Sequence, residues 1–223
     1  MIKELTTAEL YASPEKSIAS PLLFSFTYPW EALDSLSEFI KELGKTLPED
    51  EFDALGDGVY ISKTARISPT AYVGGPCIIC EDAEIRHSAF IRGSAIVGRG
   101  AVVGNSVELK NCILFDGVQV PHFNYVGDSV LGYRSHMGAG AVTSNVKSDK
   151  TPVSIACGGE RIASGRKKFG AMLGDFVEVG CNSVLNPGTV IGSNSNVYPL
   201  SSVRGYVPKN SIYKSSEAIV EKR

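Results

Sequence analysis

The chain contains 223 residues, of which 43% are hydrophobic and 21% are charged, and its formal net charge is -2. These proportions are typical of a globular domain and argue against a disordered chain or a coiled coil. The weak negative charge gives no reason to expect a nucleic-acid partner, because the phosphate backbone selects basic surfaces. The uncharged, apolar-looking stretch at residues 17–30 contains two prolines and is shorter than the roughly 18 apolar residues of a membrane span, so no membrane partner is expected.

The N-terminus begins with charged residues and lacks the apolar run of a secretory signal, which favours a cytoplasmic location. The five cysteines cannot all pair within one chain, and a reducing compartment would leave them as thiols. Cys77 and Cys80 have a metal-like spacing, but no second pair follows them, so we predict no metal.

Residues 1–57 precede the regular part of the sequence and are predicted to form a helical extension. Thr6 and Glu9 have the spacing of a capping box before a short helix. Residues 30–44 follow a proline and carry apolar side chains at helical spacing, which predicts an amphipathic helix. We expect Trp30 to be a packing anchor of that helix.

A period of six residues dominates the chain from residue 58 to residue 208. Large apolar side chains recur at every sixth position, and a small residue stands two positions before most of them. The first ten positions of the period are Ile61, Ile67, Val73, Ile79, Ile85, Ile91, Val97, Val103, Leu109 and Phe115. The period returns at Val126 and resumes at Leu173. This pattern describes a short strand followed by a tight corner, so that three strands make one triangular coil and the coils stack through parallel ladders. The sequence predicts an all-β solenoid over 58–208 and a C-terminal tail over 209–223.

Between residues 143 and 170 the period is absent, and the segment is rich in glycine, serine and basic residues. A loop of this length inside a compact domain is usually functional. We expect a mobile flap over a binding site, and the alternative is a solvated insertion.

The chain has three histidines, at positions 87, 122 and 136. Each is a candidate general base, because the ordinary imidazole pKa of about 6.5 lies close to neutral pH. His122 follows Pro121 at a point where the period is interrupted, and this position singles it out.

The repeat resembles that of the hexapeptide-repeat family of left-handed parallel β-helices, and the left hand is implied by this resemblance. Residues 121–132, PHFNYVGDSVLG, are followed by MGAG at 137–140. This run resembles the acetyltransferase domain of the bifunctional bacterial enzyme that makes UDP-N-acetylglucosamine. It also resembles the C-terminal domains of archaeal sugar-1-phosphate nucleotidylyltransferases. In that family the histidine of the H-x-x-Y-x-G-D motif is the base for N-acetylation of an amino-sugar 1-phosphate.

The resemblance implies a role for each matching residue. His122 is the catalytic base, Glu108 lies close to it and could orient the imidazole, and Asn145 lies near the amine and the thioester of acetyl-CoA. The residues expected to bind the acceptor are Arg92, Lys110, Tyr125, His136 and Lys168, with Lys150 as the competitor of Lys168. Cys181 is expected beside the cofactor, where the family has a serine, and His136 stands where the family has an asparagine. This set suits the chemistry, because an amine must lose a proton as it attacks and a phosphate needs fixed cations.

We therefore expect an N-acetyltransferase that transfers acetyl from acetyl-CoA to the amine of a glucosamine- or galactosamine-type 1-phosphate. No attached uridylyltransferase domain is expected, because about 57 residues before the repeat cannot hold one. The resemblance also implies a homotrimer. Two alternatives stay open: an acceptor that is a nucleotide-linked amino sugar or another small amine, and a catalytically silent β-helix that serves as an oligomerisation or regulatory partner.

Overall fold

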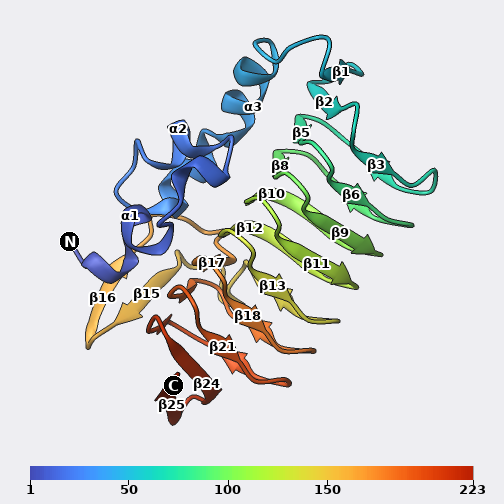
Figure 1. Cartoon of the computed structure of the whole chain (residues 1–223). Coiled ribbons are helices and arrows are strands. Elements are labelled where there is room, and N and C mark those ends of the chain that lie inside the picture. The colour runs from blue at the N-terminus through green and yellow to red at the C-terminus, as the bar shows by residue number, and fades with distance from the viewer. Residues whose placement is uncertain (223) are drawn as a thin grey trace.

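The six-residue period folds into a three-sided β-helix in the computed structural model, which describes residues 1–222 (Figure 1). Successive coils pair in parallel; residues 59–61, for example, pair with 77–79, which in turn pair with 95–97. The large residues of the period fill the interior, where Ile79, Ile91 and Val103 are all fully buried. The left-handed parallel β-helix predicted from the sequence is confirmed.

The strands form three faces. The first face contains β2 (Val59–Ser62), β5 (Cys77–Ile79), β8 (Ala95–Val97), β17 (Ala171–Leu173), β20 (Thr189–Ile191) and β23 (Tyr206–Val207), with the second halves of β10 (Glu108–Leu114) and β12 (Tyr125–Leu131). The second face contains β3 (Arg66–Ile67), β6 (Glu84–Ile85), β9 (Val102–Asn105), β11 (Gln119–His122), β13 (His136–Met137), β18 (Glu178–Val179), β21 (Asn196–Val197) and β24 (Ser211–Ser215). The third face contains β4 (Tyr72–Val73), β7 (Phe90–Ile91), the first halves of β10 and β12, β14 (Val142–Thr143), β19 (Val184–Leu185) and β22 (Ser202–Val203).

Residues 3–44 form a strap of short helices that runs along the first face, opposite to the direction in which the coils stack (Figure 1). Its elements are η1 (Lys3–Leu5), α1 (Thr7–Leu10), η2 (Pro14–Lys16), α2 (Ser20–Leu23), η3 (Pro29–Asp34) and α3 (Leu36–Gly44). Near its start, Lys209 Nζ donates to Glu9 Oε1 at 2.6 Å, and at its end Gly44 lies against the ring of Tyr60. The strap therefore connects the last coils to the first.

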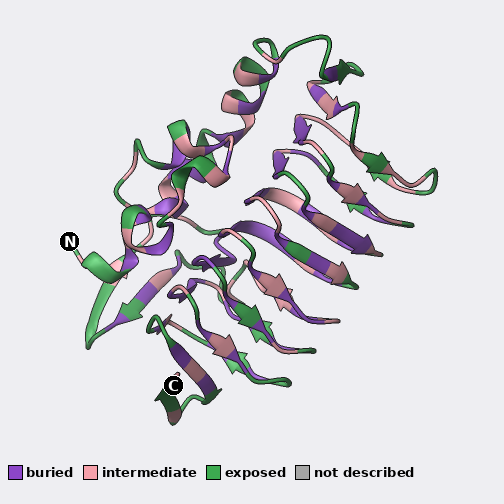
Figure 2. Ribbon diagram, viewed as in Figure 1, coloured by how far each residue is buried: buried purple, intermediate pink, exposed green. Residues whose placement is uncertain are grey.

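The strap buries side chains that would otherwise face solvent. The outward column of the first face is apolar from coil to coil and fully buried: Ile78, Ile96, Ile113, Val130, Met172 and Val190. Figure 2 shows this burial as purple residues on the strands beside the strap. Burying a large aliphatic side chain stabilises a protein by about 1.5–3 kcal/mol, so the strap contributes to the core of the solenoid.

Two local predictions for the strap are wrong. The hydroxyl of Thr6 donates to the carbonyl of Lys3 and makes no capping bond. The single helix expected over 30–44 is divided at Ser35 into η3 and α3. Trp30 is buried, as expected of a packing anchor.

Strands extend the solenoid at both ends. The strand β1 (Phe52–Ala54) pairs antiparallel with β2, although it lies in the segment that we expected to be helical. At the other end, β24 continues the parallel ladder of the second face and β25 (Ala218–Glu221) folds back on it. Much of the region expected to be a tail is therefore strand.

The interruption at 143–170 contains a β-hairpin formed by β15 (Ser154–Cys157) and β16 (Glu160–Ala163). Val153 and Ile155 are buried, and β15 lies against β23 of the first face. The prediction of a flap over the site is wrong for this part of the segment, because its apolar side chains are packed into the core.

Candidate active site

The ladders that join β7, β10 and β12 bring four of the predicted site residues to neighbouring coils. Glu108 lies opposite Tyr125, and Lys110 lies opposite Gly127. Glu108 also lies opposite Phe90 of β7, two residues before Arg92. Arg92, Glu108, Lys110 and Tyr125 thus belong to one part of the third face and its corner with the first face.

Asp128 is at the centre of this group, although no role was expected for it from the sequence. Its side chain is buried and its φ of 49° is in the left-handed region, where an aspartate is one of the better tolerated residues. Asn111 Nδ2 donates to Oδ1 at 2.8 Å, while Asn145 Nδ2 donates to Oδ2 at 2.6 Å. Lys110 Nζ lies 3.4 Å from Oδ2. These three donors compensate the buried carboxylate for its lost hydration. The last letter of the H-x-x-Y-x-G-D motif was the signal that could have identified it.

Tyr125 and Asn145 are joined within the same network. Asn145 Nδ2 lies 3.2 Å from the Tyr125 hydroxyl. Burial raises the pKa of Tyr125, and the nearby carboxylates of Asp128 and Glu108 add to this shift. The ring lies over Gly127, where a Cβ atom would overlap it, so the glycine of the motif makes room for the tyrosine.

Arg92 and Glu108 form an ion pair on the open side of the network. Arg92 Nη1 donates to Glu108 Oε1 at 2.7 Å, and this bond raises the pKa of Arg92. The two side chains are 45% and 33% exposed, so a dissolved anion can reach the guanidinium. Glu108 was expected to orient the imidazole of His122, but in this structure its carboxylate is bonded to Arg92.

His122 ends β11 at the corner between the second and third faces. Its backbone N–H donates to Oδ1 of the buried Asn124 at 3.1 Å, and Asn124 Nδ2 donates to the carbonyls of Gly138 and Ala141. Phe123 follows with a φ of 52°, an unusual conformation for a bulky residue. The backbone of this corner is therefore fixed, while the imidazole of His122 is exposed.

The same corner continues through two further coils. The N–H of Gly140 donates to the carbonyl of His122 at 3.0 Å, and the N–H of Asn182 donates to the carbonyl of Ala139 at 2.8 Å. In a parallel ladder these bonds place Ala139 and then Cys181 at the positions equivalent to His122. Cys181 is exposed, so the corner presents an imidazole and a thiol two coils apart.

Lys168 lies beside the network, at the end of the interruption. It forms a bridge with Val146, and its side chain is exposed. The next two residues are bonded to network members: the N–H of Phe169 donates to the carbonyl of Asn145 at 2.9 Å, and that of Gly170 to the carbonyl of Asp128 at 2.8 Å. Lys150, the alternative lysine, is also exposed, but its backbone N–H bonds within its own loop, to Lys147.

His136 is not brought into the group. It begins β13 opposite Gln119. It therefore lies three residues before Ala139, the residue at the coil position equivalent to His122. Its Nδ1 lies 2.7 Å from Glu178 Oε2, on the outside of the second face. Within one chain His136 therefore belongs to a different surface from Asp128 and Tyr125.

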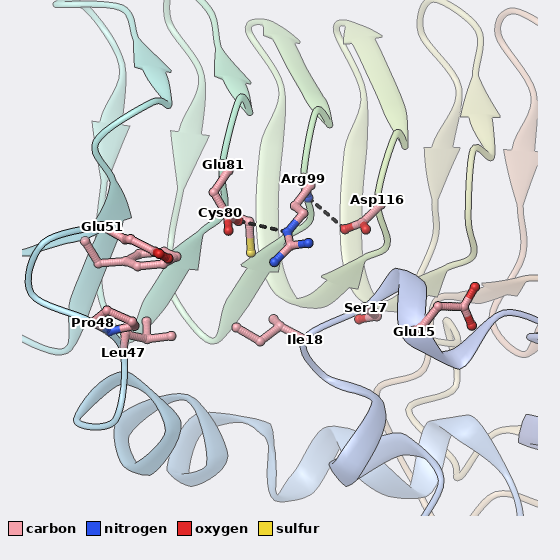
Figure 3. A pocket seen from close by; sticks show the side chains of 11 residues that line it. Glu15, Ser17, Ile18, Leu47, Pro48, Glu51, Cys80, Glu81, Arg99 and Asp116 are labelled. Carbon is pink, nitrogen blue, oxygen red and sulfur yellow. Dashed lines mark hydrogen bonds and ion pairs between the residues drawn. The ribbon is translucent and has the colours of Figure 1, made fainter.

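A separate hollow lies between the strap and the first face (Figure 3). Arg99 is central in it, with Nε 3.1 Å from Glu81 Oε2 and its backbone N–H 2.8 Å from Asp116 Oδ1. Burial raises the pKa of Asp116. None of the predicted site residues lines this hollow, whose charged groups are mainly bonded to one another.

No group of three metal-binding side chains occurs among residues 1–222. Within the same described range, no helix is long and apolar enough to cross a membrane.

These features define a β-helix protein of the hexapeptide-repeat class with a polar network beside an exposed corner histidine. Residues 73–190, just over half of the chain, match the family described as the GMPPB C-terminal domain, and the chain belongs to that family. The resemblance stated from the sequence is thereby confirmed, together with the relatives that follow.

The curated relatives are larger proteins. The chain is 40% identical over 94 residues to the bifunctional sugar-1-phosphate nucleotidylyltransferase/acetyltransferase of Sulfurisphaera tokodaii, which covers 42% of this chain and 23% of that protein. It is also 33% identical over 160 residues to the bifunctional protein GlmU of Methanococcus vannielii. This match covers 71% of this chain and 34% of that protein. The chain therefore spans about a third or less of these relatives.

Among solved structures, the acetyltransferase domain of PglB from Neisseria gonorrhoeae, in complex with acetyl coenzyme A, matches with a TM-score of 0.34. The match has 15% identity and covers 81% of this chain and 76% of that one.

Proposed function

We propose that this chain is an acetyl-CoA-dependent N-acetyltransferase whose acceptor is an amino-sugar 1-phosphate. The observation that carries the proposal is the joining of Tyr125, Asn145 and Lys110 through Asp128, close to the exposed cation of Arg92. An acceptor that carries both a phosphate and an amine needs fixed cations and polar groups a few ångströms apart. The membership of the family and the match to GlmU relatives support the same reaction class.

His122 is the proposed base. The amine nitrogen of the acceptor attacks the thioester carbonyl, and the imidazole takes the proton that the nitrogen must lose. The carbon–nitrogen bond forms as the carbon–sulfur bond breaks, and the proton passes from the imidazolium to the departing thiolate of CoA. The fixed backbone around Asn124 supports this role, because it holds the corner while the ring stays accessible.

Arg92, Lys110 and Lys168 are the proposed phosphate ligands. Arg92 is paired with Glu108 in this structure, so an incoming phosphate would compete with that carboxylate for the guanidinium. If a bound phosphate displaced Glu108 from Arg92, the Glu108 carboxylate would be free to pair with the protonated imidazole of His122. The observed ion pair is therefore compatible with the role expected for Glu108 beside His122.

Acetyl-CoA is proposed to lie along the corner that carries His122 and Cys181, with Asn145 near the thioester. The network is open to solvent on the third face, where Tyr72 and Phe90 are 61% and 43% exposed. A second copy of the chain would cover these side chains, and this supports the proposed homotrimer. The reduced, buried thiols of Cys77 and Cys112 suit the cytoplasm.

The decisive experiment measures thiol release from acetyl-CoA with a panel of acceptors at equal concentration. Glucosamine 1-phosphate and galactosamine 1-phosphate should give turnover far above their N-acetylated forms, which lack the free amine. If turnover is higher with a nucleotide-linked amino sugar, that compound, and not the sugar phosphate, is the acceptor. Thiol release with none of them would favour the silent β-helix, and co-purification with a separate nucleotidyltransferase would then support a regulatory role.

A further inference from the structure

The helix η3 of the strap holds the end of the interruption at two points. The Trp30 ring lies 5.3 Å from that of Phe169, measured between centroids, and both side chains are buried. One turn further along, Asp34 Oδ1 lies 2.5 Å from Arg166 Nη1. These two contacts lie on either side of Lys168.

The backbone that is held in this way belongs to the polar network. Phe169 and Gly170 donate their N–H groups to Asn145 and Asp128, as described above. Gly170 cannot carry a side chain here, because a Cβ atom would overlap the carbonyl oxygen of Gly127 in the motif. Trp30 is therefore linked to Asn145 by two contacts, the ring contact with Phe169 and the hydrogen bond from the Phe169 N–H to the Asn145 carbonyl. The tight packing of Gly170 limits how far this backbone can shift.

Trp30 is itself held firmly. Tyr28 stacks on it with ring centroids 4.6 Å apart and an angle of 6° between the planes. The hydroxyl of Tyr28 accepts from the N–H of Ile2 at 3.1 Å, and Glu31 Oε2 accepts from the N–H of Tyr28 at 2.8 Å. The tryptophan is thus a rigid support and not a loosely packed side chain.

We propose that Trp30 is a positioning residue of the active site, which sets the place of Lys168 and Asn145 through Phe169. The kinetic part of this inference depends on the proposed function; the structural part does not. Loss of the indole should release residues 166–170 from η3 and let the cation of Lys168 move away from the acceptor phosphate. The site then depends on a segment more than 100 residues earlier in the chain.

The chain offers a matched control for a purely structural role. Tyr11 is also a buried strap aromatic, and its ring stacks on Phe115 of the solenoid at 4.9 Å. Within residues 1–222 its ring stacks on Phe115 and its hydroxyl bonds to Val130, and neither contact involves residues 166–170. Tyr11→Leu and Trp30→Leu should therefore both weaken strap packing while differing at the site.

The structural test is hydrogen exchange of the full-length protein. Trp30→Leu should accelerate exchange of the Phe169 and Gly170 amides by about tenfold or more relative to the wild type, which corresponds to about 1.4 kcal/mol of lost protection. Tyr11→Leu should leave the exchange rates of these two amides unchanged, although it should lower the unfolding midpoint about as much as Trp30→Leu does. Equal protection of the two amides in both variants would overturn the proposal.

The kinetic test uses glucosamine 1-phosphate and acetyl-CoA. Trp30→Leu should lower kcat/KM for the acceptor by about 10- to 100-fold, the cost of misplacing groups by about 1 Å, and should raise KM for the acceptor more than KM for acetyl-CoA. Trp30→Phe, which keeps an aromatic ring against Phe169, should recover most of the loss. An equal rise of KM for both substrates, or a comparable loss of kcat/KM in Tyr11→Leu, would contradict positioning. If the wild type shows no acetyl transfer, the proposed function fails and the exchange experiment still decides whether Trp30 holds the loop.

Discussion

Asn145 Nδ2 lies 2.6 Å from Asp128 Oδ2, across 17 residues of sequence. This contact joins the start of the interruption to the last residue of the H-x-x-Y-x-G-D motif. The end of the interruption returns to the same residue through Gly170. Asp128 therefore holds both ends of the segment that departs from the repeat, the start through its carboxylate and the end through its backbone carbonyl.

Replacing Asp128 by asparagine should destabilise the protein and disable the site. The amide would keep one acceptor oxygen and turn its NH2 group toward either Asn111 or Asn145, leaving buried donors without an acceptor at a cost of about 1–3 kcal/mol. Urea unfolding measures the loss. Asp149→Asn is the control, because Asp149 pairs with Lys147 on an exposed turn. Equal stability of the two variants would show that the Asp128 network contributes little.

His122→Ala should lower kcat by about 10²–10⁴-fold, as expected for loss of a general base. Its melting temperature should stay close to that of the wild type, since the imidazole is exposed. His87 is a suitable control, because the bonds of Ser106 and Phe123 place it at the same corner two coils earlier. A comparable loss in His87→Ala, or full activity in His122→Ala, would assign the proton transfer elsewhere.

Arg92→Ala and Lys110→Ala should raise KM for a phosphorylated acceptor and leave KM for acetyl-CoA unchanged. Each substitution removes a charge-assisted bond of about 1.5–3 kcal/mol. Glu108→Gln separates two roles of the carboxylate. A lower acceptor KM would follow from releasing Arg92, whereas a lower kcat would follow from losing support of His122. If neither Michaelis constant responds to Arg92→Ala, the acceptor phosphate does not bind there.

Cys181 should be the fastest thiol to react with an aromatic disulfide reagent. The other four cysteines are buried, and burial raises the pKa of Cys112 to about 12, which suppresses its reactive thiolate. Saturating acetyl-CoA should slow the modification if the cofactor lies along this corner. Cys181→Ser should lose the rapid phase and remain active. Modification at the same rate with and without acetyl-CoA would exclude Cys181 from the cofactor site.

The coil could be predicted because its interior is specified locally. Each sixth residue must fill the same narrow space, so the apolar column is visible in the sequence without knowledge of any distant contact. The strap could not be placed in this way, although one signal existed. Ile78, Ile96, Ile113 and Val130 are outward positions of successive coils, and their apolar character marks a face that must be covered.

The site was less accessible than the fold to sequence reasoning. The identity of Asp128 was visible, but its central role depends on Asn111 and Asn145 meeting it from neighbouring coils. The position of His136 was predictable in principle, since it falls three residues short of the coil position of His122 and so faces another direction. The pairing of Glu108 with Arg92 depends on side-chain rotamers, which a spacing pattern does not specify.

The bond between Glu9 and Lys209 has a consequence for synthesis on the ribosome. The strap emerges first, but the coils against which its first residues pack are completed only when residue 209 has been made. At about 5–20 residues per second, the start of the strap around Glu9 and Leu10 waits roughly ten seconds or longer for its partners Ser193 and Lys209. The end of the strap can pack on β5 and β8 early, whereas its apolar start stays exposed on the nascent chain until the last coils are made, and this favours chaperone binding to that segment.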